Sequence, residues 1–397
     1  MFEHLDQLPA DPILGLGQQF QADPNPNKVG LSVGVFQDAS GNTPILASVK
    51  KAEAAILAAQ QSKAYIPQAG DAAFLQGITE LVLGSELAQS SADRVAAVQA
   101  AGGCGALRIA AEVAYAANPA ARIWVSTPTW ANHFPLLQSS GLELLSYPYY
   151  DETTSEIEFE AMCTALGHAR AGDLVLLHAS CHNPTGADLR SEQWDRLIEL
   201  MAKQRLVPFI DSAYQGFAVG LEEDAYGIRA AVERLPNVLV ASSCSKNFGL
   251  YRERTGVMLF AGQNSEQAQA ARSHALALAR CSYTMAPYHG GGIVGQILGD
   301  PTLTAMWREE VASMREHIQK MRVALSEALA QHQCPKDFSF IGRQRGMFSL
   351  LGIDREAIAR LRAEYGIYVL DSGRMNAAGL SAANIPVVAE AIATVIR

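Results

Sequence analysis

The sequence predicts an α/β protein, with a large domain built on a mostly parallel sheet flanked by helices and a smaller α+β domain. Short apolar runs alternate with amphipathic helical segments between about residues 94 and 243, which is typical of βαβ units. The 397 residues are enough for two or three domains. Apolar residues make up 49% of the chain and charged residues 18%, which excludes a disordered protein.

The elements of the large domain follow from apolar periodicity and from turn residues. Residues 1–44 are rich in Pro, Gly, Asp and Asn, which predicts an irregular arm, and a helical run covers about 45–60. One helix is expected to follow residues 102–105 and to end at about 117. Further helices are expected after Trp130, from a cap at Ser191, and near 224–234. The expected strands are 94–100, 122–126, 173–179, 207–211 and 238–243.

The small domain is expected to combine both ends of the chain. A long helical pattern over about 302–332 predicts a helix that joins the large domain, 45–305, to the small domain, 1–44 and 306–397. The small domain also holds the segment 338–351, a helix near 354–365 and a closing helix from about 385.

Composition and charge exclude several classes of protein. The chain has 31 Lys and Arg against 40 Asp and Glu, and a formal charge of −9 makes it a poor ligand for DNA. No apolar stretch is long enough for a transmembrane helix, and Met1–Asp6 does not resemble a signal peptide. The six scattered cysteines, with no CxxC pair, predict reduced thiols in the cytoplasm.

No metal site is expected. His178 and His182 are four residues apart, as in helical zinc sites, but they follow a strand. Four residues of extended chain span about 13 Å, so one metal ion does not bridge them easily. One of these histidines is therefore expected to serve the core.

In a parallel sheet the ligand binds beyond the carboxyl ends of the strands, so functional residues are expected just after each strand. The turn 102–105, Gly-Gly-Cys-Gly, opens a helix and is either a phosphate site or a tightly packed turn. Asp211 ends a buried strand and needs a cationic partner, either a protonated pyridine or a group in a buried salt bridge, unless it caps a helix. Tyr214 lies within reach of the same ligand.

Lys246 is the lysine best placed for chemistry. Of the eight lysines it alone follows an apolar strand and three nearby serines. A partly desolvated lysine beside a phosphate site forms a Schiff base readily, and Arg254 is suited to clamp the phosphate. Lysine, carboxylate and phosphate site together indicate pyridoxal 5′-phosphate.

Five motifs extend this interpretation to a family. The motifs are Ser242–Tyr251 followed by Glu253 and Arg254, Cys181–Gly186, Asp211–Phe217, Trp130 with Asn132 and His133, and Ser372–Asn376. With these motifs the chain closely resembles class I aminotransferases of the aspartate and aromatic branch, from Asp11 to the C-terminus. The resemblance implies the fold type I of pyridoxal phosphate enzymes.

The resemblance implies a role for each residue around the cofactor. Lys246 binds its aldehyde and then moves the proton of the reaction, and Asp211, supported by His133, keeps the pyridine nitrogen protonated. Tyr214 and Asn183 bind the phenolic oxygen. The remaining implied cofactor contacts are Trp130 on the ring, Gly103, Cys104, Ser243, Ser245 and Arg254 on the phosphate, and Tyr65 on the phosphate of the neighbouring subunit.

The resemblance also implies a substrate site shared between two subunits of a homodimer. Gly34 and Arg374 bind the α-carboxylate, and Phe348 lines the same pocket. Arg280 crosses to the partner's site and binds the distal carboxylate, so the two arginines select a dicarboxylic substrate. Trp130 and Asn183 are also implied to contact the substrate.

The sequence departs from aspartate-dedicated relatives in two places. The turn 102–105 lacks the two hydroxyl donors of the common Ser-Gly-Thr-Gly, which predicts somewhat weaker cofactor binding. Gln37, Ala64 and Met285 stand where such relatives tend to carry Lys, Asn and Asn. A less polar rim lowers the desolvation cost for an aromatic side chain, so we expect use of both aspartate and aromatic amino acids with 2-oxoglutarate in a ping-pong reaction.

Other functions stay open at this point. One is an aromatic-amino-acid aminotransferase with aspartate as a secondary substrate. Another is a pyridoxal phosphate lyase or decarboxylase, against which the distal arginine argues. A third is a non-catalytic cofactor-binding module of a transcription regulator, but the acidic chain shows no helix-turn-helix pattern.

Overall fold

The computed structural model describes residues 2–8 and 12–397, so Asp11 and its neighbours 9 and 10 lie outside the described residues. The chain forms two compact units. The larger unit comprises residues 44–317, and the smaller unit comprises residues 1–43 and 318–397. Within the described residues, no helix has the length and apolar character needed to cross a membrane.

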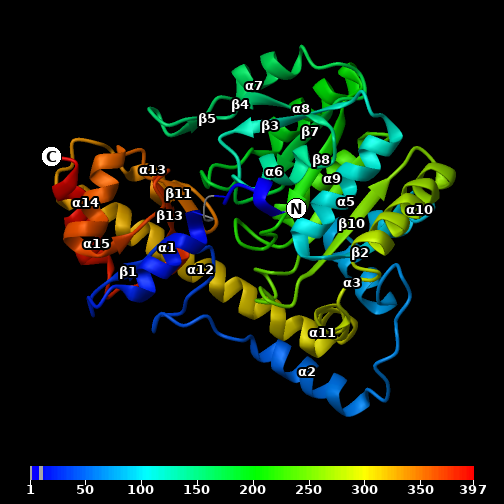
Figure 1. Cartoon of the computed structure of the whole chain (residues 1–397), viewed down its shortest axis with the longest axis horizontal. Coiled ribbons are helices and arrows are strands. Elements are labelled where there is room, and N and C mark those ends of the chain that lie inside the picture. Colours follow the sequence, from blue (N-terminus) through cyan, green and yellow to red (C-terminus); the bar gives the residue numbers. More distant parts are fainter. Residues whose placement is uncertain (1, 9–11) are drawn as a thin grey trace. The chain divides into compact units, whose positions relative to one another are not determined.

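The larger unit is built on a seven-stranded sheet (Figure 1). Six strands run in one direction, and β10 is antiparallel to both of its neighbours. The predicted α/β fold is confirmed, and the sequence patterns missed only β4 and β10 of this sheet. In spatial order the strands are β2 (Val95–Ala101), β10 (Thr255–Ala261), β9 (Val238–Ser243), β8 (Val207–Ser212), β7 (Leu174–His178), β3 (Arg122–Thr127) and β4 (Glu143–Pro148).

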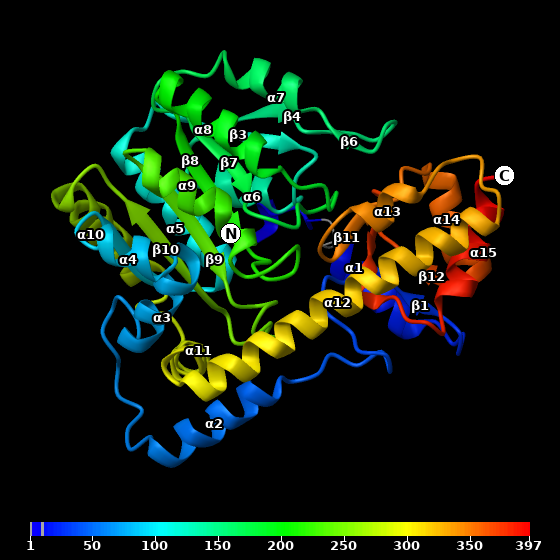
Figure 2. The same cartoon turned by 180° about the vertical axis from the view of Figure 1, so that it is seen from behind.

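Helices cover this sheet on both sides (Figures 1 and 2). Leu107 and Ile109 of α5 pack with Phe209 and Met258 of the strands in one buried cluster, which removes a large apolar area from water. The helices of the larger unit are α2 (Ala47–Ala59), α3 (Ala72–Leu83), α4 (Ser85–Ser90), α5 (Gly102–Ala117), α6 (His133–Gln138), α7 (Phe159–Leu166), α8 (Ser191–Gln204), α9 (Tyr226–Arg234), α10 (Ser265–Ser282) and α11 (Tyr288–Gly299).

The start of α8 differs from the predicted cap. Ser191 is the first helical residue rather than the N-cap, and its side chain does not cap the helix. Instead the side chain of Gln193 reaches back and accepts a hydrogen bond from the backbone N–H of Arg190 at 2.9 Å. This contact satisfies a polar group of the first turn from within the helix.

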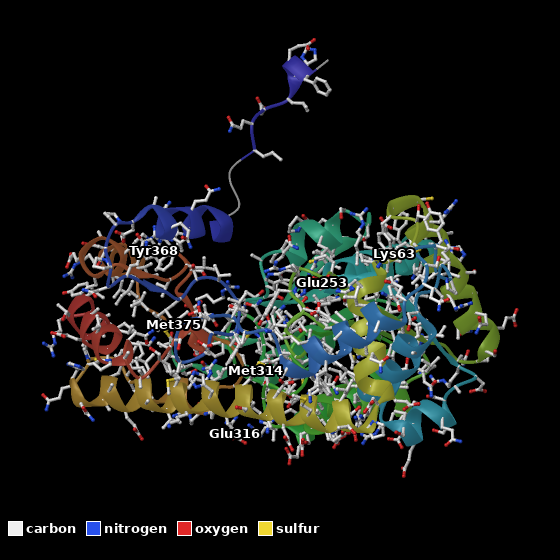
Figure 3. All side chains as sticks on the ribbon, turned by 90° about the horizontal axis from the view of Figure 1, so that it is seen from below. Lys63, Glu253, Met314, Glu316, Tyr368 and Met375 are labelled. Atoms are coloured by element: carbon white, nitrogen blue, oxygen red, sulfur yellow. The ribbon has the colours of Figure 1, made fainter. Side chains whose placement is uncertain are left out.

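The long helix α12 (Pro301–Gln331) contributes residues to both units. In its first half, Met314 is buried and Glu316 is exposed, and Figure 3 shows the two side chains on different sides of the helix. Trp307 stacks on Phe248 with ring centroids 4.3 Å apart and donates its indole N–H to the carbonyl of Asn247 at 2.8 Å. These contacts anchor the helix beside the loop that carries Lys246.

The smaller unit contains two short two-stranded sheets and several helices. The predicted irregular arm is wrong in part, because residues 12–22 form a helix. Proline fits the first position of a helix, where its missing N–H costs nothing, so Pro12 marks a helix start rather than a coil. The elements are α1 (Pro12–Ala22), β1 (Val29–Gly30), α13 (Ser339–Arg343), β11 (Phe348–Leu350), α14 (Arg355–Tyr365), β12 (Ile367–Tyr368), β13 (Arg374–Asn376) and α15 (Ile385–Val395).

Side chains of α1 and β12 join the two ends of the chain within the smaller unit. Tyr368, labelled in Figure 3, donates its hydroxyl to Asp23 at 2.8 Å. Its ring meets that of Phe20 edge-on, with centroids 5.3 Å apart. The pairing of β1 with β12 and these contacts hold residues 20–30 against the C-terminal part.

Candidate active site

The predicted site residues of the larger unit gather at one edge of the sheet. β2, β3, β8 and β9 run in the same direction, so the residues that follow them meet at their carboxyl ends. Because β10 is antiparallel, its amino end lies at this edge as well, with Thr255 opposite Ala101 and Gly256 opposite Ser243. This reversal brings Arg254 to the start of α5.

Lys246 lies over the ring of Tyr214, with its Nζ atom 4.7 Å from the ring centroid. Asp211 is buried and accepts a hydrogen bond from Nε2 of His133 at 3.1 Å. Charges from three of the predicted residues reach one thiol: burial raises the pKa of Cys104, Arg254 and Lys246 lower this pKa, and Asp211 raises it further. Asp211 lies in β8, Lys246 follows β9 and Arg254 precedes β10, so the carboxylate, the amine and the guanidinium come from neighbouring strands at the same edge of the sheet.

Asp211 stays ionised although it is buried. Burial favours the neutral carboxyl, but the hydrogen bond and the electrostatic effect of His133, with a smaller contribution from Lys246, favour the anion by more, so the pKa of Asp211 lies below its ordinary value. A buried carboxylate of this kind stabilises a positive charge placed against it.

A chain of imidazoles extends behind Asp211, in which His133 is buried and His178 is partly buried. Thr129 Oγ1 lies 2.8 Å from Nδ1 of His133 and 3.2 Å from Nε2 of His178. Burial lowers the pKa of His178 to about 3, so this ring is neutral. Because Nε2 of His133 donates to the Asp211 carboxylate, we assign the Thr129 hydroxyl as a donor to Nδ1 of His133 and as an acceptor from Nε2 of His178. Each of these three hydrogen bonds then contains one proton.

The expected separation of His178 and His182 is wrong. Their ring centroids lie 4.2 Å apart because the chain turns directly after β7, where Cys181 has a left-handed φ of 53°. His182 also stacks on Tyr149 at 4.0 Å and contacts the hydroxyls of Ser126 and Thr185 at 3.0 and 2.9 Å. The described residues contain no group of three or more His, Cys, Asp or Glu side chains placed to hold a metal ion.

The turn 102–105 forms the first turn of α5, and no side chain caps this helix at Ala101. Gly102 has a φ of 71°, and a Cβ atom there would lie 2.5 Å from Nη2 of Arg254. A Cβ atom on Gly103 would lie 3.1 Å from Cβ of Ser243. Glycine thus keeps open a space bounded by backbone N–H groups, a guanidinium and the linked hydroxyls of Ser243 and Ser245, 3.1 Å apart.

Two further residues of the larger unit lie beside these groups. Trp130 meets the ring of His133 edge-on at 5.2 Å. Asn183 is buried in a loop whose backbone is fixed by Asp188, which accepts the N–H groups of Cys181 and His182 at 2.7 and 2.8 Å. The loop therefore presents Asn183 from a rigid support.

The smaller unit brings together the three residues predicted for the α-carboxylate. The guanidinium of Arg374 lies over the ring of Phe348, 4.2 Å from its centroid, and donates to the carbonyl of Ser32 at 3.0 Å. A Cβ atom on Gly34 would lie 2.6 Å from Cζ of Phe348. Gly34 thus allows the backbone to approach the ring that supports Arg374.

Two predicted residues point outward. Tyr65 is 86% exposed, and Arg280 is exposed in the last turn of α10. Sequence analysis missed Thr129 and His178 as neighbours of Asp211. The only signal for them was their position just after β3 and at the end of β7.

Comparison with known proteins identifies the family. The model of the family "Aminotransferase class I and II" matches residues 26–392. The chain belongs to the class I and II aminotransferases. It is 44% identical over 394 residues to an aromatic-amino-acid aminotransferase of Pseudomonas aeruginosa, covering 99% of this chain and 98% of that protein. It is 43% identical over 396 residues to the aspartate aminotransferase of Escherichia coli, covering the whole of both.

A solved structure of another aminotransferase agrees. The aromatic-amino-acid aminotransferase of Burkholderia pseudomallei, covalently bound to pyridoxal phosphate, superposes with a TM-score of 0.97 at 42% identity and with full coverage of both chains. Both the fold and the family predicted from the motifs of this aminotransferase are thus confirmed.

Proposed function

We propose that this aminotransferase uses pyridoxal 5′-phosphate to move the amino group of L-aspartate and of aromatic amino acids to 2-oxoglutarate. The observation that carries the proposal is the placement of the Lys246 amine over Tyr214, in one electrostatic cluster with the buried Asp211 and with Arg254. Relatives of both kinds, aspartate and aromatic, are similar to the chain to nearly the same extent.

The larger unit offers groups suited to both ends of this cofactor. The glycine-lined space at the start of α5, with Arg254 and two serine hydroxyls, suits a phosphate. The ionised Asp211 suits a protonated pyridine nitrogen. When bound, the cofactor supplies an aldehyde for amine exchange and a ring that stabilises negative charge at the substrate α-carbon.

The side chains then divide the remaining tasks. Lys246 would supply the amine that holds the cofactor; once the substrate amine has displaced it, its Nζ would accept the α-proton of the substrate and deliver it to the carbon on the other side of the substrate nitrogen. Asp211, which accepts a hydrogen bond from His133, would stabilise the positive charge of the protonated pyridine nitrogen. Tyr214 and Asn183 would hold the oxygen of the cofactor ring by hydrogen bonds, and Trp130 would cover the ring.

Charge and exposure support the proposed substrates and assembly. Arg374 is suited to the α-carboxylate, and Arg280 is proposed to reach the distal carboxylate in a partner subunit's site. The exposure of Tyr65 and Arg280 supports a homodimer in which each subunit completes the other's site. None of the six cysteines, all of which lie in the described part of the chain, forms a disulfide; this supports a reducing compartment, which we propose to be the cytoplasm.

An absorbance titration tests this function. The cofactor-loaded protein is titrated with L-aspartate and, in parallel, with L-phenylalanine, without an oxo acid. We expect both amino acids to bleach the visible band. In competition assays with 2-oxoglutarate present, the kcat/KM values for the two amino acids should lie within about a thousandfold, or about 4 kcal/mol. Bleaching by aspartate alone would restrict the enzyme to dicarboxylates, and a large preference for phenylalanine would make the aromatic role the main one.

Two variants separate this function from its alternatives. Lys246→Ala should still bind the cofactor but should not convert amino acids, whereas Lys203→Ala, at an exposed lysine of α8, should behave as the wild type. Release of ammonia or CO2 by the wild type in place of a new amino acid would indicate a lyase or decarboxylase. No reaction with either amino acid would favour a non-catalytic module.

A further inference from the structure

Arg322 on α12 is a fully buried arginine within the smaller unit, with 0% exposure. It contacts the segment that leads into β11 and the first residues of that strand. Its donors are directed to five oxygen atoms. These are the carbonyls of Ile341 at 3.1 Å, Arg345 at 3.2 Å, Gly346 at 2.8 Å and Phe348, and the hydroxyl of Ser349 at 2.7 Å.

This geometry needs the planar guanidinium. Arginine has five N–H donors in one rigid fork, which matches the number of acceptors, whereas lysine has three donors on a single atom. Gly346 turns the segment with a φ of 72°, and Ser349 donates its hydroxyl onward to Gln344 at 2.6 Å. Arg322 is therefore the centre of a hydrogen-bonded frame that fixes residues 341–349.

The frame leads directly to the proposed α-carboxylate site. Phe348, whose carbonyl Arg322 binds, supports the guanidinium of Arg374 with its ring and touches the backbone at Gly34. In the β11–β13 pair, Leu350 lies opposite Arg374 and Phe348 opposite Asn376. Asn376 in turn donates to the carbonyls at positions 33 and 35, on either side of Gly34.

We propose that Arg322 is a positioning residue for the carboxylate-binding group formed by Arg374, Gly34 and Phe348. The inference rests on the proposed function, because that function assigns this group to the substrate. Arg322 touches no substrate itself. It sets the backbone of Phe348, and through the ring of Phe348 it sets the orientation of Arg374.

The main test replaces Arg322 by lysine in the cofactor-loaded enzyme. Arg322→Lys should raise KM for both the amino acid and the oxo acid about 10- to 100-fold, because small displacements of a binding group cost this much, while kcat changes little. Calorimetry with succinate, an unreactive dicarboxylate, should show a dissociation constant raised by the same factor. Conversion of 2-phenylethylamine, which lacks the carboxylate, should keep its wild-type rate constant.

Two further variants make the test decisive. Gln319→Met removes one hydrogen bond from the same helix to the same segment, Nε2 to the carbonyl of Gly342 at 2.7 Å, without reaching Phe348. This control should leave KM unchanged. Ser349→Ala removes one of the five acceptors of Arg322 and should raise KM about threefold. This factor corresponds to about half of the free energy that a hydrogen bond from a charged donor contributes.

The outcomes distinguish the inference from the function beneath it. A wild-type enzyme that does not transaminate contradicts the proposed function. If the wild type transaminates, unchanged KM and unchanged succinate binding in Arg322→Lys overturn the positioning role, as does an equal loss with phenylethylamine. If Arg322→Lys does not fold, Ser349→Ala decides, and an unchanged KM in that variant overturns the inference.

Discussion

Single residues near Asp211 link protonation to stability. Burial lowers the pKa of His178 to about 3, against about 6.5 for an unperturbed histidine. Between these values the unfolded chain binds a proton that the folded protein excludes. The free energy of unfolding should therefore fall as the pH drops below about 6.5, by up to about 1.4 kcal/mol per pH unit from this group.

We expect His178→Gln to reduce this slope by about 1 kcal/mol per unit between pH 6 and 5. Urea denaturation at a series of pH values measures it. His168→Gln, at an exposed histidine, serves as the control and should keep the wild-type slope. An unchanged slope in His178→Gln would show that His178 is protonated in the folded protein.

The thiol of Cys104 is expected to limit the affinity for the cofactor. This thiol lies in the first turn of α5, which we propose to bind the phosphate and where a hydroxyl would be the stronger donor. Cys104→Thr should tighten pyridoxal phosphate binding about two- to tenfold, since one neutral hydrogen bond contributes about 0.5–1.5 kcal/mol. Equilibrium dialysis of the cofactor measures this change, with Cys334→Ser as the matched control. Weaker binding in Cys104→Thr would show that the site requires the thiol.

At the scale of elements, the start of α5 depends on glycine. Gly102→Ala places a Cβ atom 2.5 Å from the Arg254 guanidinium at a left-handed backbone position. We expect at least tenfold weaker cofactor binding, because Arg254 must move. Gly299→Ala, at the end of α11 with nothing within 4 Å, should bind the cofactor as the wild type does. Equal cofactor affinities in the two variants would contradict the proposed phosphate site at the start of α5.

Most elements of the larger unit could be predicted from sequence because buried parallel strands are continuous apolar runs. The strands at 122–127 and 238–243 lie within one residue of their expected bounds. The reversal of β10 could not be predicted, because its direction depends on which strands flank it rather than on its own residues. The contact between His178 and His182 could not be predicted either, because the chain turns at Cys181 where extended chain was expected.

The site residues divide in the same way. Lys246, Asp211 and Arg374 stand in motifs with a chemical meaning of their own, so sequence alone was enough to propose them. Thr129 and Arg322 act on other protein groups, and their importance depends on folded neighbours. No motif in the chain marks such residues.

At the scale of the whole molecule, the proposed dimer can be tested by mixing subunits. Lys246→Ala and Arg280→Ala should each be inactive toward aspartate. In a mixed dimer, one site combines both defects and the other has neither. Random mixing of subunits makes half of the dimers mixed, so about a quarter of the wild-type sites should be restored. No recovery after refolding the two variants together would mean that Arg280 does not act across subunits.

The antiparallel strand β10 has a consequence for biosynthesis. β2 lies at the edge of the sheet, where β10 is its one partner among the strands that the structure describes, and about 150 residues separate Ala101 from Thr255. At about 5–20 residues per second, a ribosome needs about 8–30 seconds to add them. During that time β2 is an unpaired apolar strand on the nascent chain, exposed to chaperones and to aggregation. Arg254 is made just before β10, so the proposed phosphate site of the newly made chain is complete only when the last strand of this sheet is made.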